Sequence, residues 1–240
     1  MANILLLGYG RMGKLIEKAA IARGHHIVGR VSASTPLSNQ MLLAADVAID
    51  FSLPNIAEGL VTRAVEADVP VASGTTGWSS AGLQTQVEKE KRTAFIHATN
   101  MSIGVNVVFA ANQLIAKLLG PTNQYTTTIS ETHHIHKVDA PSGTAVTLAE
   151  KVLLGMPQYQ EWKLETQGEH LKASQLPVTA SREGEVFGDH ELIFESEVDQ
   201  ITLAHHAKSR QGFAIGAILA AEFLIDKKGV FTMANVLGLD

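Results

Sequence analysis

The sequence contains no cysteine, which excludes disulfide bonds, thiolate nucleophiles and thiolate metal sites. This is compatible with a reducing compartment, and we expect a cytoplasmic protein. The sequence also has no uninterrupted apolar run of the ~18 residues that a membrane-spanning helix needs, so we expect no membrane partner. The opening residues, MANILLLGYG, are apolar only briefly before glycines interrupt them, and we expect no signal peptide.

Positive charge is also scarce, because 19 Lys and Arg residues face 24 Asp and Glu residues and the net charge is −5. Proteins that bind nucleic acid present a basic face or stripe, and this composition predicts none. Any anion that the chain binds should therefore be small and held locally. Hydrophobic residues, in contrast, make up 45% of the 240 residues, which is enough for a sizeable core in one large or two modest domains.

In the first hundred residues, short β-branched runs alternate with amphipathic stretches. We expect strands at residues 3–8, 26–31, 47–52, 69–73 and 94–98, and helices at 11–23, 54–67 and 79–92. Strands that alternate with helices pair in parallel through right-handed crossovers. This part of the sequence therefore predicts an N-terminal Rossmann-like, doubly wound parallel sheet.

The pattern changes after residue 102. A long helix is expected at 104–119, a Thr-rich strand at YTTTISETHH, a helix at 144–154, and alternating strands over 175–207. These elements predict a second, α+β domain with a mixed or antiparallel sheet. An apolar helix at 212–226 would suit packing back on the first sheet. We therefore expect an α/β protein with one domain formed by 1–102 and 211–240 and another by 103–210.

The motif GYGRMG places Gly8, Gly10 and Gly13 between the first expected strand and the first expected helix. In that context Gly8 permits a tight turn, Gly10 lets the backbone approach a pyrophosphate, and Gly13 lets helix and strand pack closely. The helix N-terminus would add N–H groups and a positive dipole end. The alternative is a glycine turn that only closes a βα unit.

The segment GRVSAST after the second strand bears on the cofactor. An acid usually lies there and binds a free ribose 2′-OH, whereas this chain has Ser32 and Ser34, with Arg30 and Arg11 nearby. This arrangement favours NADPH over NADH and leaves the use of both open. Two further loops, Ser73–Gly77 and Ala98–Ser102, follow strands at their carboxyl ends, where open α/β sheets bind ligands, although both could be ordinary turns.

The stretch ETHHIHKVDAPSGTA, from Glu131 to Ala145, gathers three histidines and a lysine before a Pro-Ser-Gly-Thr bend. Such a cluster indicates a metal, an anion or a proton transfer. Neighbouring histidines on a strand point to opposite faces, which argues against a shared zinc ion, and we expect no metal. The bend can form an anion site from the N–H groups of Gly143 and Thr144 and from nearby hydroxyls.

This stretch, together with GYGRMG, GTTG, ATNMSIGVN, REGEVFGDHE and AKSRQGFAIGA, resembles the 4-hydroxy-tetrahydrodipicolinate reductase family along essentially the whole chain. The resemblance implies NAD(P)H-dependent reduction of 4-hydroxy-tetrahydrodipicolinate, a small dicarboxylate, in diaminopimelate and lysine biosynthesis. It also implies a dinucleotide-binding domain formed by 1–102 and 211–240, and a domain at 103–210 that binds substrate and builds a homotetramer.

The resemblance also implies roles for individual residues. His133 would be the acid/base histidine and Lys137 the proton donor, while His134, Lys137, Ser142, Gly143 and Thr144 would bind substrate. The cofactor would contact Gly8, Tyr9, Gly10, Arg11, Met12, Gly13, Gly74, Thr75, Thr76, Ala98, Thr99, Asn100 and Met101.

Two other functions and several roles stay open. A Rossmann-type nucleotide-binding sensor would keep the cofactor site without turnover, and a metal hydrolase would use the histidine cluster. Glu131 and Asp139 would brace the histidines or cap local turns, and the residues alone do not separate these roles. His136 and Arg210 receive no defined role.

Overall fold

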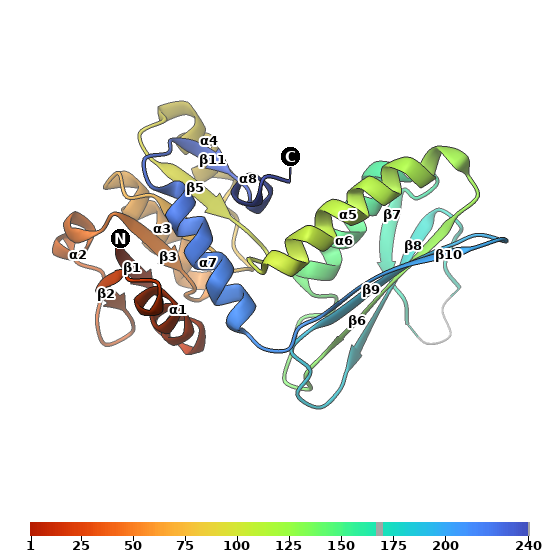
Figure 1. Cartoon of the computed structure of the whole chain (residues 1–240), viewed down its shortest axis with the longest axis horizontal. Helices are drawn as coiled ribbons and strands as arrows, with labels where there is room; N and C mark the ends of the chain where they lie inside the picture. The colour runs from red at the N-terminus through yellow and green to blue at the C-terminus, as the bar shows by residue number, and fades with distance from the viewer. Residues whose placement is uncertain (167–169, 240) are drawn as a thin grey trace. The chain divides into compact units, whose positions relative to one another are not determined.

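The computed structural model describes residues 1–166 and 170–239. The chain forms two compact units, one of Met1–Ile103 with Arg210–Asp240 and the other of Gly104–Ser209 (Figure 1). Each unit has its own sheet and its own hydrophobic core.

The first unit is built on a six-stranded parallel sheet in the order β11-β5-β4-β3-β1-β2. The central strands of this sheet are mostly apolar and buried, as expected of a parallel sheet that is covered on both faces, whereas the edge strand β2 is partly exposed. The strands are β1 (Asn3–Leu7), β2 (His26–Val31), β3 (Val47–Asp50), β4 (Val71–Ser73), β5 (Ala94–His97) and β11 (Gly229–Phe231).

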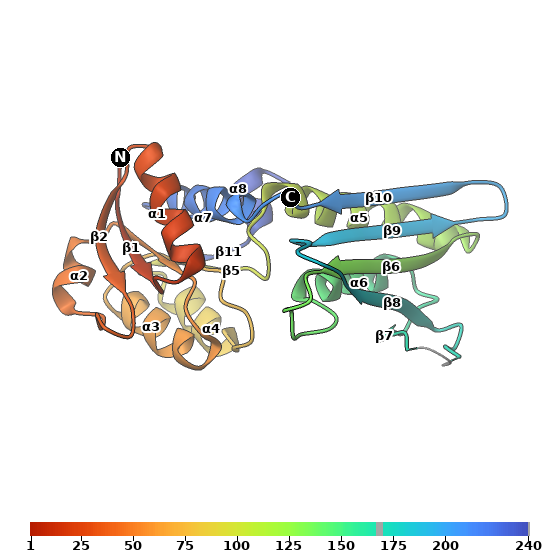
Figure 2. The same ribbon diagram turned by 90° about the horizontal axis from the view of Figure 1, so that it is seen from below.

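Helices cover both faces of this sheet (Figure 2). One face carries α1 (Arg11–Ala22), α7 (Gln211–Leu224) and α8 (Met233–Leu237), and the other carries α2 (Asn39–Ala44), α3 (Pro54–Glu66) and α4 (Ala81–Glu90). The predicted Rossmann-like doubly wound sheet is therefore confirmed. The C-terminal helix α7 packs on α1 and on β3 and β4, as its small apolar residues predicted.

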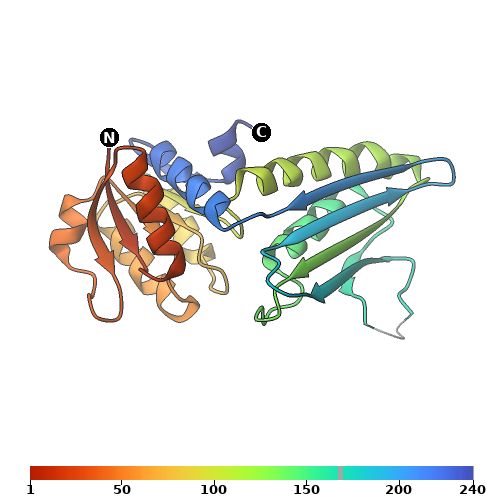
Figure 3. The same ribbon diagram turned by 60° about the horizontal axis from the view of Figure 1, so that its bottom comes forward.

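The second unit has a five-stranded mixed sheet in the order β10-β9-β6-β8-β7. Strands β7 and β6 are each parallel to β8, whereas β9 is antiparallel to both β6 and β10. The strands are β6 (Thr126–His133), β7 (Glu161–Leu164), β8 (Gln175–Arg182), β9 (Asp189–Glu195) and β10 (Gln200–His206). Helices α5 (Ile103–Leu119) and α6 (Gly143–Gly155) lie on one face of the sheet (Figure 3).

Burial alternates along β6 with the period of two that a strand dictates. Thr127, Ile129, Glu131 and His133 are buried, whereas the residues between them are exposed or half-buried. Two ionisable residues, Glu131 and His133, thus share the inner face of the strand with the core residue Ile129 and with Thr127. A strand pattern of this kind places charge-bearing side chains where water is scarce, which is the setting of the candidate site.

The helical segment Ile103–Thr122 is long and apolar enough to suit a membrane span by length and composition, a test that core helices of globular proteins also pass. One stripe of it, including Val105, Phe109 and Ala116, is buried in the core of the second unit. Asn112 is also buried and donates from Nδ2 to the carbonyl of Leu148 at 2.9 Å. This buried stripe is what a core helix needs.

Candidate active site

The glycine turn of the first unit has the shape that the motif predicts. Gly8 has a φ of +99°, and a Cβ there would lie 2.4 Å from the carbonyl oxygen of Phe51. A Cβ at Gly13 would lie 2.4 Å from the carbonyl oxygen of Gly8, so strand and helix meet closely. Around Gly10, in contrast, a Cβ would meet no described atom within 4 Å. The turn is therefore open at the one glycine that a pyrophosphate would approach.

Glu17, which no sequence motif indicated, links Tyr9 of this turn to Arg30 of β2. Arg30 donates from Nε to Glu17 Oε1 at 2.8 Å, the Tyr9 hydroxyl donates to Glu17, and the Arg30 guanidinium lies 5.8 Å from the centre of the Tyr9 ring. The hydrogen bond from Arg30 lowers the pKa of Glu17. Ser32 Oγ lies 3.1 Å from Ser34 Oγ in the turn after β2. Arg30 is thus already paired, whereas Arg11 is exposed.

The loop Gly74–Thr76 is fixed by two aromatic side chains that no motif indicated. Trp78 donates from Nε1 to the Thr75 carbonyl at 2.9 Å, and His97 Nε2 lies 2.8 Å from the same oxygen. His97 Nδ1 lies 2.7 Å from Ser80 Oγ, which leaves Nε2 as the nitrogen that donates. The Trp78 and His97 rings are 4.8 Å apart. These contacts hold the loop at the carboxyl edge of the sheet.

The other predicted cofactor residues differ in exposure. Thr76 and Thr99 are exposed, Met12 and Ala98 are half-buried, and Asn100 is buried and accepts the N–H of Ser102 through Oδ1 at 2.8 Å. The Met101 side chain belongs to the core. Met101 could therefore contact a cofactor only through its backbone.

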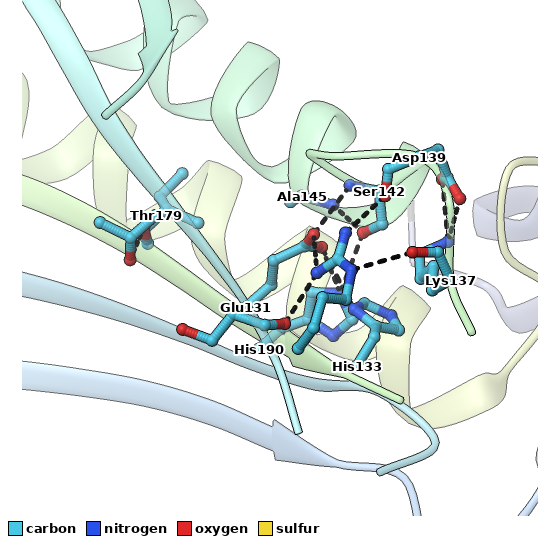
Figure 4. Close-up of polar contacts among 11 residues, drawn as sticks. Glu131, His133, Lys137, Asp139, Ser142, Ala145, Thr179 and His190 are labelled. Atoms are coloured by element: carbon cyan, nitrogen blue, oxygen red, sulfur yellow. Dashed lines mark hydrogen bonds and ion pairs between the residues drawn. The ribbon is translucent and has the colours of Figure 1, made fainter. Parts of the chain in front are cut away.

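In the second unit, the histidine stretch folds around one buried carboxylate (Figure 4). Glu131 Oε2 lies 3.5 Å from His133 Nδ1 and 3.6 Å from His190 Nε2, and β6 and β9 pair in the register that sets Glu131 opposite His190. The N–H of Ser142 donates to Glu131 Oε1 at 3.0 Å, and Arg182 Nη1 lies 3.5 Å from the same oxygen. The sequence analysis missed His190 and Arg182, because only strand pairing brings them here.

The Ser-Gly-Thr bend is the N-terminus of α6. Ser142 is its N-cap and accepts the N–H of Ala145 through Oγ at 3.2 Å, and the same oxygen lies 3.3 Å from His190 Nε2. Gly143 and Thr144 are the first two helical residues, so their N–H groups lie at the positive end of the helix dipole. This is an arrangement that can bind a carboxylate.

Lys137 is held beside this bend. Its Nζ donates to both carboxylate oxygens of Asp139 at 2.8 Å, which identifies Asp139 as an ion-pair partner. Arg182 donates from Nε to the Lys137 carbonyl at 3.2 Å and from Nη2 to the Asp139 carbonyl, so the segment is tied to β8. His136 is exposed and lies 3.4 Å from Glu185. The ring of His134 lies 6.1 Å from that of His136.

Burial and neighbouring charges set the protonation of the site. Burial would raise the pKa of Glu131, but the contacts of His190 and Ser142 outweigh it and lower the pKa to about 2. Burial lowers the pKa of His133 to about 4; the charge of Glu131 opposes this shift, whereas the electrostatic effects of His190, Lys137 and Arg182 add to it. At neutral pH the site therefore contains a carboxylate, a neutral His133 and the ammonium group of Lys137.

The histidines of this stretch do not all converge on one point. Among the described residues, the group with metal-ligand spacing is Glu131, His133 and His190, whose ligand atoms lie within 4.8 Å of one another, and neither His134 nor His136 is part of it. The structure thus unites His133 and Ser142 around Glu131, and pairs Lys137 with Asp139. Arg210 immediately precedes α7 in the first unit.

Comparison with known proteins gives one result over the whole chain. The family descriptions "Dihydrodipicolinate reductase, N-terminus" and "Dihydrodipicolinate reductase, C-terminus" match residues 2–101 and 104–237. A 4-hydroxy-tetrahydrodipicolinate reductase from Christiangramia forsetii is 43% identical over 236 residues, which cover 98% of this chain and 97% of the relative. One from Alkaliphilus metalliredigens is 36% identical over 234 residues, which cover 96% of each.

Solved structures share the fold. The dipicolinate-bound dihydrodipicolinate reductase from Paenisporosarcina sp. TG-14 aligns with a TM-score of 0.74 at 20% identity and covers 97% of this chain and 98% of that one. An engineered D-amino acid dehydrogenase bound to NADP+ aligns with a TM-score of 0.53 at 12% identity, covering 97% and 93%.

Proposed function

The chain belongs to the dihydrodipicolinate reductase family, and on this premise we propose that it reduces 4-hydroxy-tetrahydrodipicolinate to tetrahydrodipicolinate, with His133 and Lys137 handling the proton. Membership makes it an NAD(P)H-dependent oxidoreductase of diaminopimelate and lysine biosynthesis. The observation that carries the proposal is the joint presence, around one bend, of a neutral buried histidine, an ammonium group and a helix N-terminus.

The proton chemistry follows from the charge state of these groups. A neutral His133 cannot donate a proton as an imidazolium ion at pH 7, whereas the ammonium group of Lys137 can. We therefore assign the donated proton to Lys137 Nζ, and we assign to His133 the role of accepting or relaying a proton through its own ring nitrogen. The ion pair with Asp139 holds Lys137 near the bend.

The substrate carboxylates would bind at the start of α6. Ser142, Gly143 and Thr144 supply the helix N-terminus there, and Lys137 and His134 lie on the segment that precedes it. Charge-assisted hydrogen bonds of this kind contribute about 1.5–3 kcal/mol each. A bound dicarboxylate would thus balance the positive charge of Lys137 and of the helix N-terminus.

The cofactor residues of the first unit fit a dinucleotide, because the turn is open at Gly10 and α1 begins directly after it. The loops at Gly74–Thr76 and Ala98–Met101 lie at the carboxyl ends of β4 and β5. When bound, the nicotinamide supplies the hydride. The lack of an acid at Ser32 supports a preference for NADPH, with NADH also used.

The experiment is an assay of the purified chain with 4-hydroxy-tetrahydrodipicolinate made in situ from pyruvate and aspartate semialdehyde. We expect substrate-dependent oxidation of NADPH, NADH or both at 340 nm. No rate above the blank with either nucleotide would contradict the proposal. Titration with nucleotide and with a stable dicarboxylate, such as dipicolinate, separates the reductase from a nucleotide-binding sensor, since a sensor needs no dicarboxylate site.

A cytoplasmic location stays a prediction. We further propose that the chain forms a homotetramer through its second unit. The face of the mixed sheet opposite α5 and α6 carries the exposed residues Thr126, Thr128 and Ser130 of β6. An uncovered sheet face with short side chains can pack on a copy of itself. Sedimentation should give a mass four times the 25.7 kDa of the chain, and a monomer would contradict this part of the proposal.

A further inference from the structure

A single buried carboxylate lies between the two halves of the candidate site. The Glu131 side chain is 0% exposed. One of its oxygens faces the rings of His133 and His190, and the other accepts the N–H of Ser142 beside Arg182. Glu131 thus contacts both the residue assigned to proton handling and the residue that begins the anion-binding helix (Figure 4).

We propose that Glu131 is a positioning residue that fixes the tautomer of His133 and, through Ser142, holds the start of α6 beside it. This inference rests on the proposed function for its kinetic consequences, but its structural content is a statement about Glu131, His133 and Ser142 alone.

The tautomer follows from the donors and acceptors present. An ionised carboxylate only accepts hydrogen bonds, so a neutral His133 that turns Nδ1 toward Glu131 is stabilised when Nδ1 carries the proton. Glu131 Oε2 and His133 Nδ1 are both buried, and neither has a hydrogen-bond partner within the described residues. Leaving either buried atom unpaired would be unfavourable. Their 3.5 Å approach is therefore the natural pairing for both.

The other ring nitrogen of His133, Nε2, is the atom that can take part in proton transfer. A Cβ on Gly188 would lie 3.0 Å from His133 Nε2, and Gly188 has a φ of +146° that favours glycine. The backbone beside His133 Nε2 therefore has no side chain that would cover this nitrogen. With Nδ1 protonated, Nε2 carries a lone pair and can accept a proton.

His190 extends the same arrangement to α6. Its Nε2 lies 3.6 Å from Glu131 Oε2 and 3.3 Å from Ser142 Oγ, while Ser142 itself donates to the other oxygen of Glu131. The carboxylate, the imidazole and the N-cap form a closed set of contacts. Movement of Glu131 would therefore disturb the proton-handling histidine and the anion-binding turn together.

A bound metal ion is the competing role for Glu131, His133 and His190. Two histidines and a carboxylate form a zinc ligand set in some enzymes. Here, however, the guanidinium of Arg182 lies 3.5 Å from the same carboxylate, and the charge of Lys137 acts on His133. These cations repel a divalent ion, and the Ser142 N–H already uses one carboxylate oxygen.

The kinetic test compares Glu131→Gln with Glu131→Asp and with the control Glu185→Gln, which removes an exposed carboxylate of the same unit. A glutamine side chain has one acceptor oxygen, whereas both carboxylate oxygens of Glu131 face donor groups. We expect Glu131→Gln to lower kcat about 10- to 100-fold, by analogy with the loss of a carboxylate that orients a functional histidine. KM for the dicarboxylate should rise, whereas KM for the nucleotide should not change. Glu131→Asp, which keeps the charge, should retain more activity.

The pH profile separates positioning from a merely structural effect. The charge of Glu131 raises the pKa of His133, while His190, Lys137 and Arg182 lower it. Removing the charge in Glu131→Gln should therefore move the acid limb of kcat/KM to lower pH. A kcat within threefold of the wild type and a superimposable pH profile would overturn the inference while leaving the reductase proposal intact.

A measurement of the His133 ring in the wild-type protein decides the case even if the Glu131 variants do not fold. In ¹⁵N NMR spectra at pH 7, assigned by loss of the signal in His133→Gln, His133 should be a neutral ring protonated at Nδ1. A ring protonated at Nε2 would overturn the inference, whether or not the protein turns over substrate. Micromolar binding of Zn²⁺ that shifts the His133 and His190 signals together would favour the metal role instead and would also overturn it.

Discussion

At the scale of single residues, a neutral His133 lies among the charged side chains of Glu131, Lys137 and Arg182. The sequence motif predicted His133, Lys137 and the Ser142 turn because these residues are contiguous in the chain. It could not predict the pairing of Glu131 with His190, since this pairing depends on the register between β6 and β9. The ion pair of Glu17 with Arg30 was hidden for the same reason, because it joins a helix to a strand.

The buried His133 predicts a pH dependence of stability. An unfolded chain binds a proton on this histidine near pH 6.5, whereas the folded protein does so only near pH 4. The unfolded state therefore holds more protons between these values, and the free energy of unfolding decreases as the pH falls from 6.5 to 4. The contribution, on the order of 2–3 kcal/mol, is fully present above pH 6.5.

Urea unfolding of the wild type and of His133→Gln at pH 7, 5.5 and 4.5 measures this contribution. The variant should lose less stability on acidification than the wild type. His136→Gln, changed at an exposed histidine, is the control. Equal slopes for the wild type and His133→Gln would show that His133 is not the group responsible.

The turn after β2 predicts a change in cofactor preference. Ser32→Glu places a carboxylate where a ribose 2′-phosphate would lie, so we expect it to weaken NADPH binding more than NADH binding, by roughly tenfold or more in the ratio of dissociation constants. Fluorescence titration with both nucleotides is the measurement. An equal loss for the two nucleotides would refute the assignment of Ser32 to the ribose site.

At the scale of elements, the apolar strands of the first hundred residues and the long helices were predicted well, whereas four short elements were not. Strands β1–β5 and helices α1, α3, α4, α5, α6 and α7 lie where β-branched runs and amphipathic stretches predicted them. Strands β7 and β11 and helices α2 and α8 have only three to six residues each and carry too little pattern. The parallel pairing of β6 with β8 could not be predicted from the sequence either. An alternating pattern indicates a half-buried strand, but it does not indicate whether that strand runs parallel or antiparallel to its neighbour.

The packing of α7 on the first unit gives a prediction for a single glycine. A Cβ on Gly216 would lie 1.7 Å from the carbonyl oxygen of Met101, in the loop assigned to the cofactor. Although alanine favours a helix, Gly216→Ala should destabilise the protein by about 2–3 kcal/mol because backbone must move. It should also weaken nucleotide binding.

Gly59→Ala in α3 is the matched control, since a Cβ there would meet no described atom within 4 Å. It should be neutral or stabilising by up to about 1 kcal/mol. Thermal unfolding of both variants is the measurement. If Gly216→Ala were as stable as Gly59→Ala, α7 would not pack on the Met101 loop as described.

At the scale of the whole molecule, the chain folds into two units with separate cores. Composition predicted a protein with a sizeable core and a small, locally bound anion, and the periodicity predicted two kinds of sheet. The identity of the reaction came from motifs spread along the chain and from relatives that cover its length. The tasks assigned to each unit and the tetramer stay predictions.

The most direct test of the central claim is steady-state oxidation of NADPH and NADH by the wild type, Lys137→Met and His133→Gln with 4-hydroxy-tetrahydrodipicolinate. Because positioned acid and base groups contribute about 10²- to 10⁴-fold to rates, each substitution should lower kcat/KM at least about 100-fold. Nucleotide affinity should stay at the wild-type value, since both residues lie in the second unit. Variants that retain kcat/KM within threefold of an active wild type would contradict the account.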